Sequence, residues 1–431
     1  MGLLVELFSS KIKVEGADKV DRIILHCDLN CFYANVEMLY HPEVRHLPIA
    51  VGGDVEKRHG IILTKNGLAK SYGIKTGEAL WEARQKCPDL VIFPPDFRKY
   101  LKFSQLVRGI FSDYTDLIEP FGIDEAWLDI TDSYHLFGTP YRVAYLIKER
   151  IKSELGITAS VGVSYNKVFA KLGSDYKKPD AITVITRSNK SVIVDPLPVD
   201  ELLFVGRQTR KRLNLYNINT IGDLAQADVG WLKQQFGKNG LMLHAYANGE
   251  DTSPVMLGGE QHPVKSVGNS STTVCDMVTM QDACLVLHVL TQSVAARLRE
   301  QGLKGRCLSI YIRDNQLSGA SFQMTLEQPS DLVEVIWHEA CHLLGQRYDM
   351  RVPLRSIGIA ISQLCCANSH QQLSMFESDS PKQRKLEITL DQIRGRFGHQ
   401  SVNYAVLKLH PLLTDFNPKG DHVIFPIGWR R

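Results

Sequence analysis

Two acidic residues, Asp124 and Glu125, stand side by side in an apolar, β-prone run over residues 122–131. Successive strand side chains point to opposite faces, so both acids can face one way only where the chain turns. A third acid, Asp28, ends an apolar strand upstream. Three neighbouring acids repel one another unless a cation lies among them. The spacing therefore indicates a Mg²⁺ site, with solvated turn acids as the alternative.

Such a trio suits two-metal phosphoryl transfer, in which two Mg²⁺ ions activate the attacking oxygen and stabilise the leaving one. We expect Asp28 and Asp124 to bridge the two ions, with the Leu29 carbonyl as a further ligand. Glu125 would hold the ion that handles an attacking 3′-hydroxyl.

Further residues could bind a nucleotide. Lys178 follows an expected helix and could reach a triphosphate, as could Thr64 and Lys70, although a lone lysine is more often simply solvated. Tyr33 lies five residues after Asp28, where its ring could pack under a deoxyribose and clash with a 2′-hydroxyl. A core aromatic residue is the alternative for Tyr33.

Strands that alternate with helices must position these residues. We expect helices over 31–40, 98–115, 140–155 and 166–175, a strand over 158–163, and a compact α/β stretch over 48–94. This order predicts an α/β (α+β) core that brings Asp28 next to Asp124.

The second half of the chain changes pattern. Residues 187–256 are expected to be helical, and a helix–turn–helix around Gly206 and Arg207 offers backbone N–H groups to a phosphate, or else is a plain surface hairpin. Residues 253–265 have the composition of a linker. A third domain over 266–365 combines alternating strands with two helices.

Composition narrows the class of protein. The 431 residues are 44% hydrophobic and 23% charged, with a net charge of +3. No apolar run approaches the roughly 20 residues that span a bilayer, and no secretion signal precedes the first strand. Nine cysteines without a CxxC pair favour a reducing compartment, so we expect a cytoplasmic protein without a membrane partner.

One motif points to a different activity. His338-Glu339-Ala340-Cys341-His342 matches HExxH, whose histidines share a helix face in zinc proteases. The extended zinc-binding motif is absent and no downstream glutamate stands out as a third ligand. A chance match on a solvated or packed helix is the better interpretation.

Several runs, in order, resemble the motifs of Y-family, translesion DNA polymerases of the bacterial DNA polymerase IV/UmuC branch. The run over 26–37 resembles the first motif of that family, and the runs over 48–53, 123–129 and 160–179 resemble later ones. Lys265 and Ser266 begin a run that resembles the entry to its little-finger domain. The resemblance covers about residues 22–365.

The resemblance implies a right-hand polymerase with a ferredoxin-like palm, small fingers, a helical thumb with a helix-hairpin-helix and an α/β little finger. The implied division is an N-terminal extension at 1–21, a palm at 22–30 and 95–186, fingers at 31–94, a thumb at 187–256, a linker at 257–265, a little finger at 266–365 and a tail at 366–431.

The resemblance also implies a role for each site residue. Asp28, Leu29, Asp124 and Glu125 would hold two Mg²⁺ ions, and Tyr33 would be the steric gate against ribonucleotides. One set of residues would hold the dNTP triphosphate through backbone N–H groups and side chains, and a second set of residues would contact DNA. The nucleotide set is Cys31, Phe32, Tyr33, Thr64, Lys70 and Lys178; the DNA set is Gly206, Arg207, Lys265 and Ser266.

Four positions in the palm, fingers and thumb depart from the family pattern. Asn30 stands where polymerase IV has an aspartate, although UmuC-like members share the asparagine. Lys70 replaces a common arginine and loses its bidentate fork, and Gly67 stands where many members have a phosphate-contacting tyrosine. Phe204 replaces a glycine in the turn of the thumb hairpin.

The tail carries a further resemblance. Gln372, Leu373, Met375 and Phe376 belong to a pentapeptide that resembles the motif bacterial polymerases insert into the β sliding clamp. Downstream, Leu386, Leu390, Ile393 and Phe397 form one apolar stripe of an expected helix, which would pack on the little finger or bind another partner.

The sequence thus predicts a monomeric, nucleoid-associated DNA polymerase without a proofreading exonuclease, which extends primer–template DNA past lesions in the DNA damage (SOS) response. UmuD- or RecA-type proteins are further candidate partners. A catalytically silent polymerase-fold accessory subunit, recruited through the clamp, is the alternative.

Overall fold

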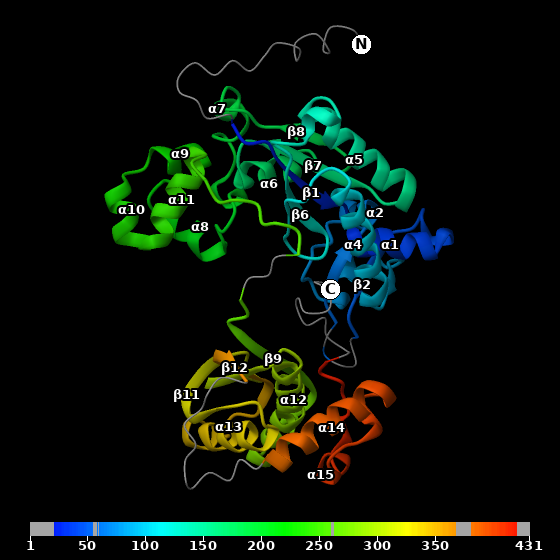
Figure 1. Cartoon of the computed structure of the whole chain (residues 1–431), viewed down its shortest axis with the longest axis vertical. Coiled ribbons are helices and arrows are strands. Elements are labelled where there is room, and N and C mark those ends of the chain that lie inside the picture. The colour runs from blue at the N-terminus through cyan, green and yellow to red at the C-terminus, as the bar shows by residue number, and fades with distance from the viewer. Residues whose placement is uncertain (1–20, 55–57, 59, 260–262, 368–380, 420–431) are drawn as a thin grey trace. The chain divides into compact units, whose positions relative to one another are not determined.

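The computed structural model describes residues 21–54, 58, 60–259, 263–367 and 381–419. The chain divides into two compact units, and Figure 1 labels their helices and strands. The first combines residues 1–39 with 98–258, and the second combines 40–97 with 259–431. In the described part of the chain, no helix has the length and apolar character needed to cross a membrane.

A five-stranded sheet forms the centre of the first unit, in the order β5-β6-β1-β7-β8. The pairs are antiparallel except β7 with β8. Every residue of β1 is buried, as expected for a central strand. The strands are β1 (Ile24–Leu29), β5 (Ile118–Pro120), β6 (Glu125–Asp129), β7 (Ala159–Ser164) and β8 (Ile182–Val184).

Four helices accompany this sheet, at the places where the sequence pattern predicts them. α5 begins where the Thr139 hydroxyl accepts from the Arg142 N–H, and it ends at Gly156 in the left-handed conformation (φ 70°). Asn166 caps α6 in the same way. The helices are α1 (Phe32–Tyr40), α4 (Phe97–Ser112), α5 (Pro140–Leu155) and α6 (Lys167–Tyr176).

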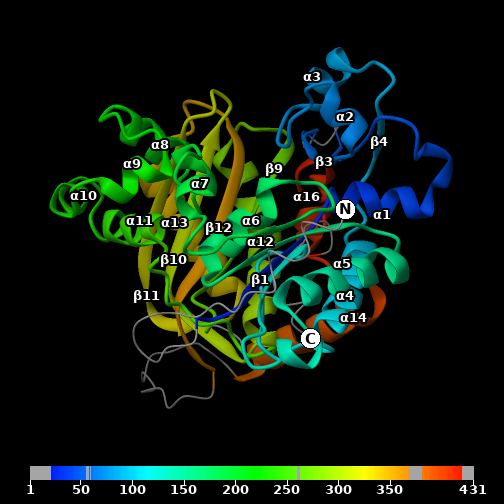
Figure 2. The same ribbon diagram turned by 90° about the horizontal axis from the view of Figure 1, so that it is seen from above.

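The rest of the first unit is helical, and Figures 1 and 2 both show α8 to α11 gathered as one group. The expected first helix of the thumb hairpin is only a 3₁₀ turn over Val199–Glu201, because Leu202 leaves the helical conformation. The helices are α7 (Lys190–Ile193), α8 (Arg207–Asn214), α9 (Ile221–Gln226), α10 (Val229–Phe236) and α11 (Lys238–Asn248).

A small α/β element opens the second unit, with strands in the order β3-β2-β4. Its buried residues, such as Ile62 and Leu80, form a core of their own. The elements are β2 (Ile49–Gly52), β3 (Ile62–Lys65), α2 (Gly67–Ser71), α3 (Leu80–Lys86) and β4 (Val91–Phe93).

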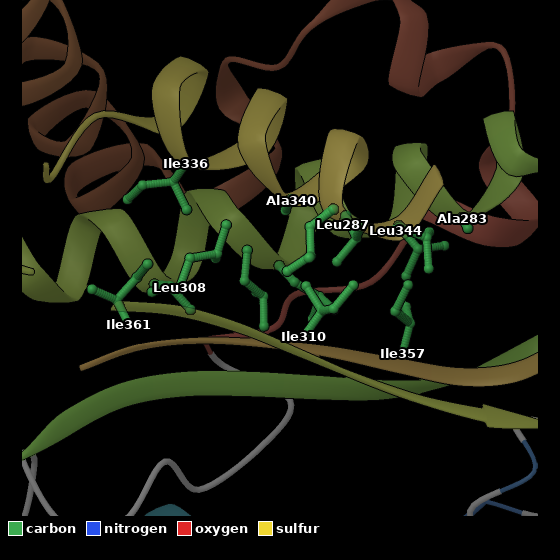
Figure 3. Packing of buried hydrophobic residues seen from close by; sticks show 14 of the residues in the cluster. Ala283, Leu287, Leu308, Ile310, Ile336, Ala340, Leu344, Ile357 and Ile361 are labelled. Atoms are coloured by element: carbon green, nitrogen blue, oxygen red, sulfur yellow. The ribbon is translucent and has the colours of Figure 1, made fainter. Parts of the chain in front are cut away.

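The second unit continues with a four-stranded antiparallel sheet in the order β11-β10-β12-β9. Two helices pack on this sheet, α12 (Met280–Glu300) and α13 (Val333–Arg347). In Figure 3, Leu287 of α12 and Leu344 of α13 point towards Ile310 and Ile357 of the sheet. The elements are β9 (Ser266–Met277), α12 (Met280–Glu300), β10 (Leu303–Asp314), β11 (Gly319–Ser330), α13 (Val333–Arg347) and β12 (Leu354–Cys366).

The tail helix α14 (Pro381–Phe397) forms where it is predicted, but the ends of its apolar stripe do not pack on the little finger, which was one of the two alternatives expected for it. Leu386 and Phe397 are exposed, whereas Glu387 is buried. The helix docks through charged side chains, and Glu387 accepts from the backbone N–H of Val333 at the start of α13. Two short helices follow, α15 (Ala405–Lys408) and α16 (Pro411–Thr414).

Candidate active site

The hairpin between β5 and β6 brings two of the three acids to the end of β1. Asp28 lies directly opposite Glu125 in the antiparallel register, and the Leu29 N–H donates to the Asp124 carbonyl over 3.0 Å. Gly122 makes the turn with φ 89°, which a side chain would disfavour. Local sequence and strand pairing together place the acids at one edge of the sheet.

Two lysines bring positive charge to these acids. Lys171 Nζ lies 2.7 Å from Glu125 Oε2 and 3.6 Å from Asp28 Oδ2. Lys178 Nζ donates to Asp28 Oδ2 over 2.6 Å and lies equally close to Asp175 Oδ1. An ammonium therefore bridges the catalytic candidates, where the sequence predicts a metal ion.

The acids remain under electrostatic strain in spite of these lysines. Burial raises the pKa of Asp28 to about 6, and the charge of Glu125 adds to the effect. Burial likewise raises the pKa of Asp124 to about 7, followed by repulsion from Glu125 and Asp28. For Asp175, burial acts to raise the pKa, but Lys171 and Lys178 outweigh it and hold the pKa below its usual value.

These raised pKa values show that the cluster could accept more positive charge. Carboxylate oxygens are the ligands that Mg²⁺ prefers, so the residues present fit the ion that the fold implies. Among the described residues, no three acidic, histidine or cysteine side chains converge closely enough to hold a metal in the present arrangement. The Lys171 ammonium lies within 4 Å of both Asp28 and Glu125, where an ion would be held.

Tyr33 is held in place by neighbours in the same unit. Its ring stacks on Tyr100, with centroids 4.3 Å apart and planes within 12°. The Tyr100 hydroxyl donates to the buried Glu37 over 2.8 Å, and Lys99 pairs with the same carboxylate. Burial, and then the charge of Asp124, raise the pKa of Tyr33 to about 12, so its hydroxyl stays protonated.

The remaining nucleotide candidates are divided between the two units. Cys31, with φ 46°, and Phe32 begin α1, where backbone N–H groups lack helical partners. Thr64 lies on β3 and Lys70 is exposed on α2 in the second unit.

The DNA candidates lie on exposed positions. Gly206 and Arg207 begin the basic helix α8, and Lys265 and Ser266 lead into β9. Phe204 adopts a left-handed backbone (φ 70°) at the thumb turn. The clamp-binding candidates Gln372, Leu373, Met375 and Phe376 lie outside the described residues.

The sequence suggested no role for three residues of the site, Lys171, Asp175 and His26. Lys171 and Asp175 lie at i and i+4 on α6, and Lys178 follows the end of this helix, so Asp175 pairs with two cations. His26 precedes Asp28 by two residues on β1 and therefore shares its face. Both spacings can be read from the sequence, but they indicate a role in the site only once α6 is known to pack on β1.

The HExxH motif lies on α13. No group of three His, Cys, Asp or Glu side chains that could hold a metal ion occurs there among the described residues. The His342 side chain is exposed, and its Nδ1 lies 3.9 Å from Glu339.

Comparison with known proteins identifies the class. A solved Y-family DNA polymerase chimera, Dbh-Dpo4(243-245)-Dbh, superposes with a TM-score of 0.69 at 24% identity, over 80% of this chain and 99% of that chain. The fold is therefore that of a Y-family DNA polymerase.

Sequence comparison gives the family. The models of the impB/mucB/samB family and of its C-terminal domain match residues 27–175 and 264–375, and the model described as the DNA polymerase-iota thumb domain matches 201–251. The curated DNA polymerase IV of Acetivibrio thermocellus is 47% identical, covering 90% of this chain and 97% of the relative. That of Clostridium kluyveri is 37% identical, covering 90% and 98%. The chain belongs to this family, as a bacterial Y-family DNA polymerase of the DNA polymerase IV type.

Proposed function

We propose that this DNA-directed DNA polymerase adds dNTPs to a primer 3′-hydroxyl at the cluster around Asp28, Asp124 and Glu125, and that it does so opposite damaged templates at low fidelity. The polymerase activity and the translesion class follow from the family. The role of each residue is our proposal, supported by the register that pairs Asp28 with Glu125 and by the raised pKa values of Asp28 and Asp124.

Asp28, Asp124, Glu125 and the Leu29 carbonyl would hold two Mg²⁺ ions. When bound, these ions would activate the attacking oxygen and neutralise charge on the leaving phosphate. Asp28 and Asp124 would be shared between the ions, since burial and the neighbouring acids disfavour a charged carboxylate at both positions and a cation would offset this.

Lys178 would bind the triphosphate. Its ammonium lies 2.6 Å from Asp28 and would exchange that carboxylate for a phosphate oxygen. The N–H groups of Cys31, Phe32 and Tyr33 would contribute from the start of α1, with Thr64 and Lys70 from the fingers. The Tyr33 ring, which Tyr100 holds in place, would exclude a 2′-hydroxyl.

DNA is the substrate of the enzyme, and backbone phosphates would supply most of the affinity. Gly206 and Arg207 in the thumb, with Lys265 and Ser266 at the entry to the little finger, would contact the backbone. Affinity should therefore fall steeply between low and moderate salt. An affinity unchanged over that range would contradict the proposal.

The tail would recruit the enzyme to a replication site. Leu373, Met375 and Phe376 would fill an apolar pocket of the β sliding clamp, and Gln372 would bond at its rim. We place a monomeric enzyme in the cytoplasm, at the nucleoid, because its substrate lies there. A requirement for UmuD- or RecA-type partners would show as activity that appears only when they are added.

Primer extension on a primed template with Mg²⁺ and dNTPs tests the central proposal. Wild type should extend the primer, and Asp124→Ala should not, while both bind DNA with similar affinity. Extension by Asp124→Ala would refute the metal assignment. Absence of extension by both proteins, with clamp present, would favour the silent accessory subunit.

A further inference from the structure

His26 is a fully buried imidazole beside the catalytic acids. Its Nδ1 lies 2.8 Å from the Ser174 hydroxyl on α6, and its Nε2 lies 3.2 Å from Glu125 Oε2. Nε2 makes no hydrogen bond to any described residue in the present arrangement. A buried polar atom without a partner is unfavourable, so its proximity to a functional carboxylate calls for an explanation.

The ring cannot turn elsewhere to satisfy this nitrogen. Trp127 packs against it edge to face, with centroids 5.2 Å apart. The Trp127 indole N–H already donates to the Lys167 carbonyl over 2.8 Å, so it is not a hydrogen-bond partner for His26. Ser174 fixes the other end of the ring and belongs to a helix packed on β1. Nε2 is therefore aimed permanently at Glu125.

We propose that His26 is a positioning residue that orients the Glu125 carboxylate towards the metal ions, a role that rests on the proposed function of Glu125. With its proton on Nε2, the imidazole donates to Glu125 once that carboxylate turns slightly towards it. The Ser174 hydroxyl lies 2.7 Å from the Lys171 carbonyl, to which it donates, and 2.8 Å from Nδ1; with the His26 proton on Nε2 it would turn its own proton to Nδ1. Such outer hydrogen bonds fix the orientation of metal ligands in other proteins.

Lys171 holds the same oxygen of Glu125, and the two partners differ in an important way. The Lys171 ammonium, 2.7 Å from Oε2, is a cation and competes with a metal ion for this carboxylate. An uncharged imidazole donor does not compete, so it can stay in place when the site is loaded. His26 thus keeps Glu125 oriented when the acid has exchanged its lysine for metal.

The test measures metal binding without turnover. Mn²⁺ is titrated by electron paramagnetic resonance into the enzyme bound to primer–template DNA and a non-hydrolysable dNTP analogue. His26→Leu should weaken Mn²⁺ binding about tenfold, as loss of an outer hydrogen bond does elsewhere. His26→Gln, which keeps an N–H donor, should restore most of the affinity. The affinity for DNA should not change in either variant.

A matched control separates orientation from packing. His288 of α12 is a second buried imidazole, stacked on Trp337 and distant in the sequence from the acids. His288→Leu should lower thermal stability but leave Mn²⁺ binding unchanged. Should His26→Leu not fold, Ser174→Ala, which frees one end of the ring, should still weaken Mn²⁺ binding measurably.

Normal Mn²⁺ binding by His26→Leu, with stability lowered as in the control, would overturn the positioning role. Equal loss of Mn²⁺ affinity in His26→Leu and His26→Gln would overturn it as well, since the donor would not matter. Primer extension by wild type tests the proposed function separately, so the two failures can be told apart.

Discussion

Two buried clusters of acids and bases in this molecule differ in the cation that pairs with the acids, which is lysine in one and arginine in the other. The catalytic cluster of the first unit consists of Asp28, Asp124 and Glu125 with Lys171 and Lys178. The anchor cluster of the second unit holds α14 on the sheet domain. Its members are Arg299, Asp331, Arg384, Glu387 and Asp391.

Arginine makes the anchor cluster a permanent structure. The Arg299 guanidinium binds Glu387 and donates through Nε to Asp391 over 2.7 Å, and both members of the Arg299–Glu387 pair are only 5–6% exposed. Burial acts to lower the pKa of Arg299, but the hydrogen bond and charge of Asp391 outweigh it and raise the pKa. The planar fork of arginine suits several fixed acceptors at once.

The catalytic cluster uses lysine, which is a point charge on a flexible stem. Its ammonium groups compensate the acids only in part, as the raised pKa values of Asp28 and Asp124 show. The comparison teaches that burial of acids alone does not mark a functional site. Burial also raises the pKa of Glu387 in the anchor cluster to about 7, so a raised pKa does not separate the two clusters. The catalytic acids are paired with lysine, whereas Glu387 is paired with the planar fork of Arg299.

The largest expected effect separates the two clusters by activity. Asp28→Asn should lower the rate of single-nucleotide incorporation by about 10³-fold or more, the scale of losing one group that stabilises transition-state charge. The melting temperature in EDTA should not fall, because a repulsive carboxylate has been removed. A markedly lower melting temperature would mean that this cluster, too, is mainly structural.

Arg299→Met should lower stability without lowering the rate of incorporation. It leaves buried carboxylates without their partner, which typically costs about 3–5 kcal/mol of unfolding free energy. Incorporation by the folded enzyme at low temperature should stay near wild type. Denaturant unfolding measures the loss. The matched control is Arg351→Met, whose pair with Asp349 is exposed and worth about 0–1 kcal/mol.

The two clusters also show how much the sequence predicts. The acids at strand ends, the register-forming strands and helix α5 follow from local pattern, and the family is confirmed by comparison. The anchor cluster was not predicted, because Glu387 and Arg299 are 88 residues apart and only tertiary packing joins them. The charged face through which α14 docks was not predicted for the same reason, since its buried partners lie far away in the sequence.

The full active site could not be predicted either, because several of its contacts join residues that are far apart in the sequence. The sequence alone suggested Lys178 but not that it lies against Asp28, 150 residues away. His26 had no predicted role, and only the packing of α6 and β6 on β1 brings Ser174 and Glu125 to its ring. Domain boundaries and individual site roles stay predictions.

Lys178→Ala tests whether the lysines of the catalytic cluster serve the nucleotide. It should raise the KM for dNTP about tenfold, the loss of one charged hydrogen bond, with a smaller change in kcat. Steady-state incorporation gives both values. Lys152→Ala is the control, because Lys152 pairs with Asp180 on the surface and should leave the KM unchanged. An equal KM for wild type and Lys178→Ala would assign Lys178 to structure alone.

The smallest expected effect is a pH dependence of the metal-free protein. Burial and repulsion raise the pKa of Asp124 from 3.8 to about 7 in the folded state. The folded state then binds more protons than the unfolded state between these values, so stability falls as pH rises through this range. Melting temperature in EDTA should therefore drop by a few degrees between pH 5 and pH 8, as differential scanning calorimetry would measure.

Mg²⁺ should reduce this fall, because a cation favours the charged carboxylate that the proton otherwise neutralises. Asp124→Asn should lessen the dependence in EDTA without abolishing it, since residue 124 could no longer titrate but Asp28 and Glu387 still would. Glu387→Gln in the anchor cluster should leave the response of the pH profile to Mg²⁺ unchanged. A wild-type profile equally steep with and without Mg²⁺ would show that the acids of the first unit do not bind the ion, and the contrast between the two clusters would fail.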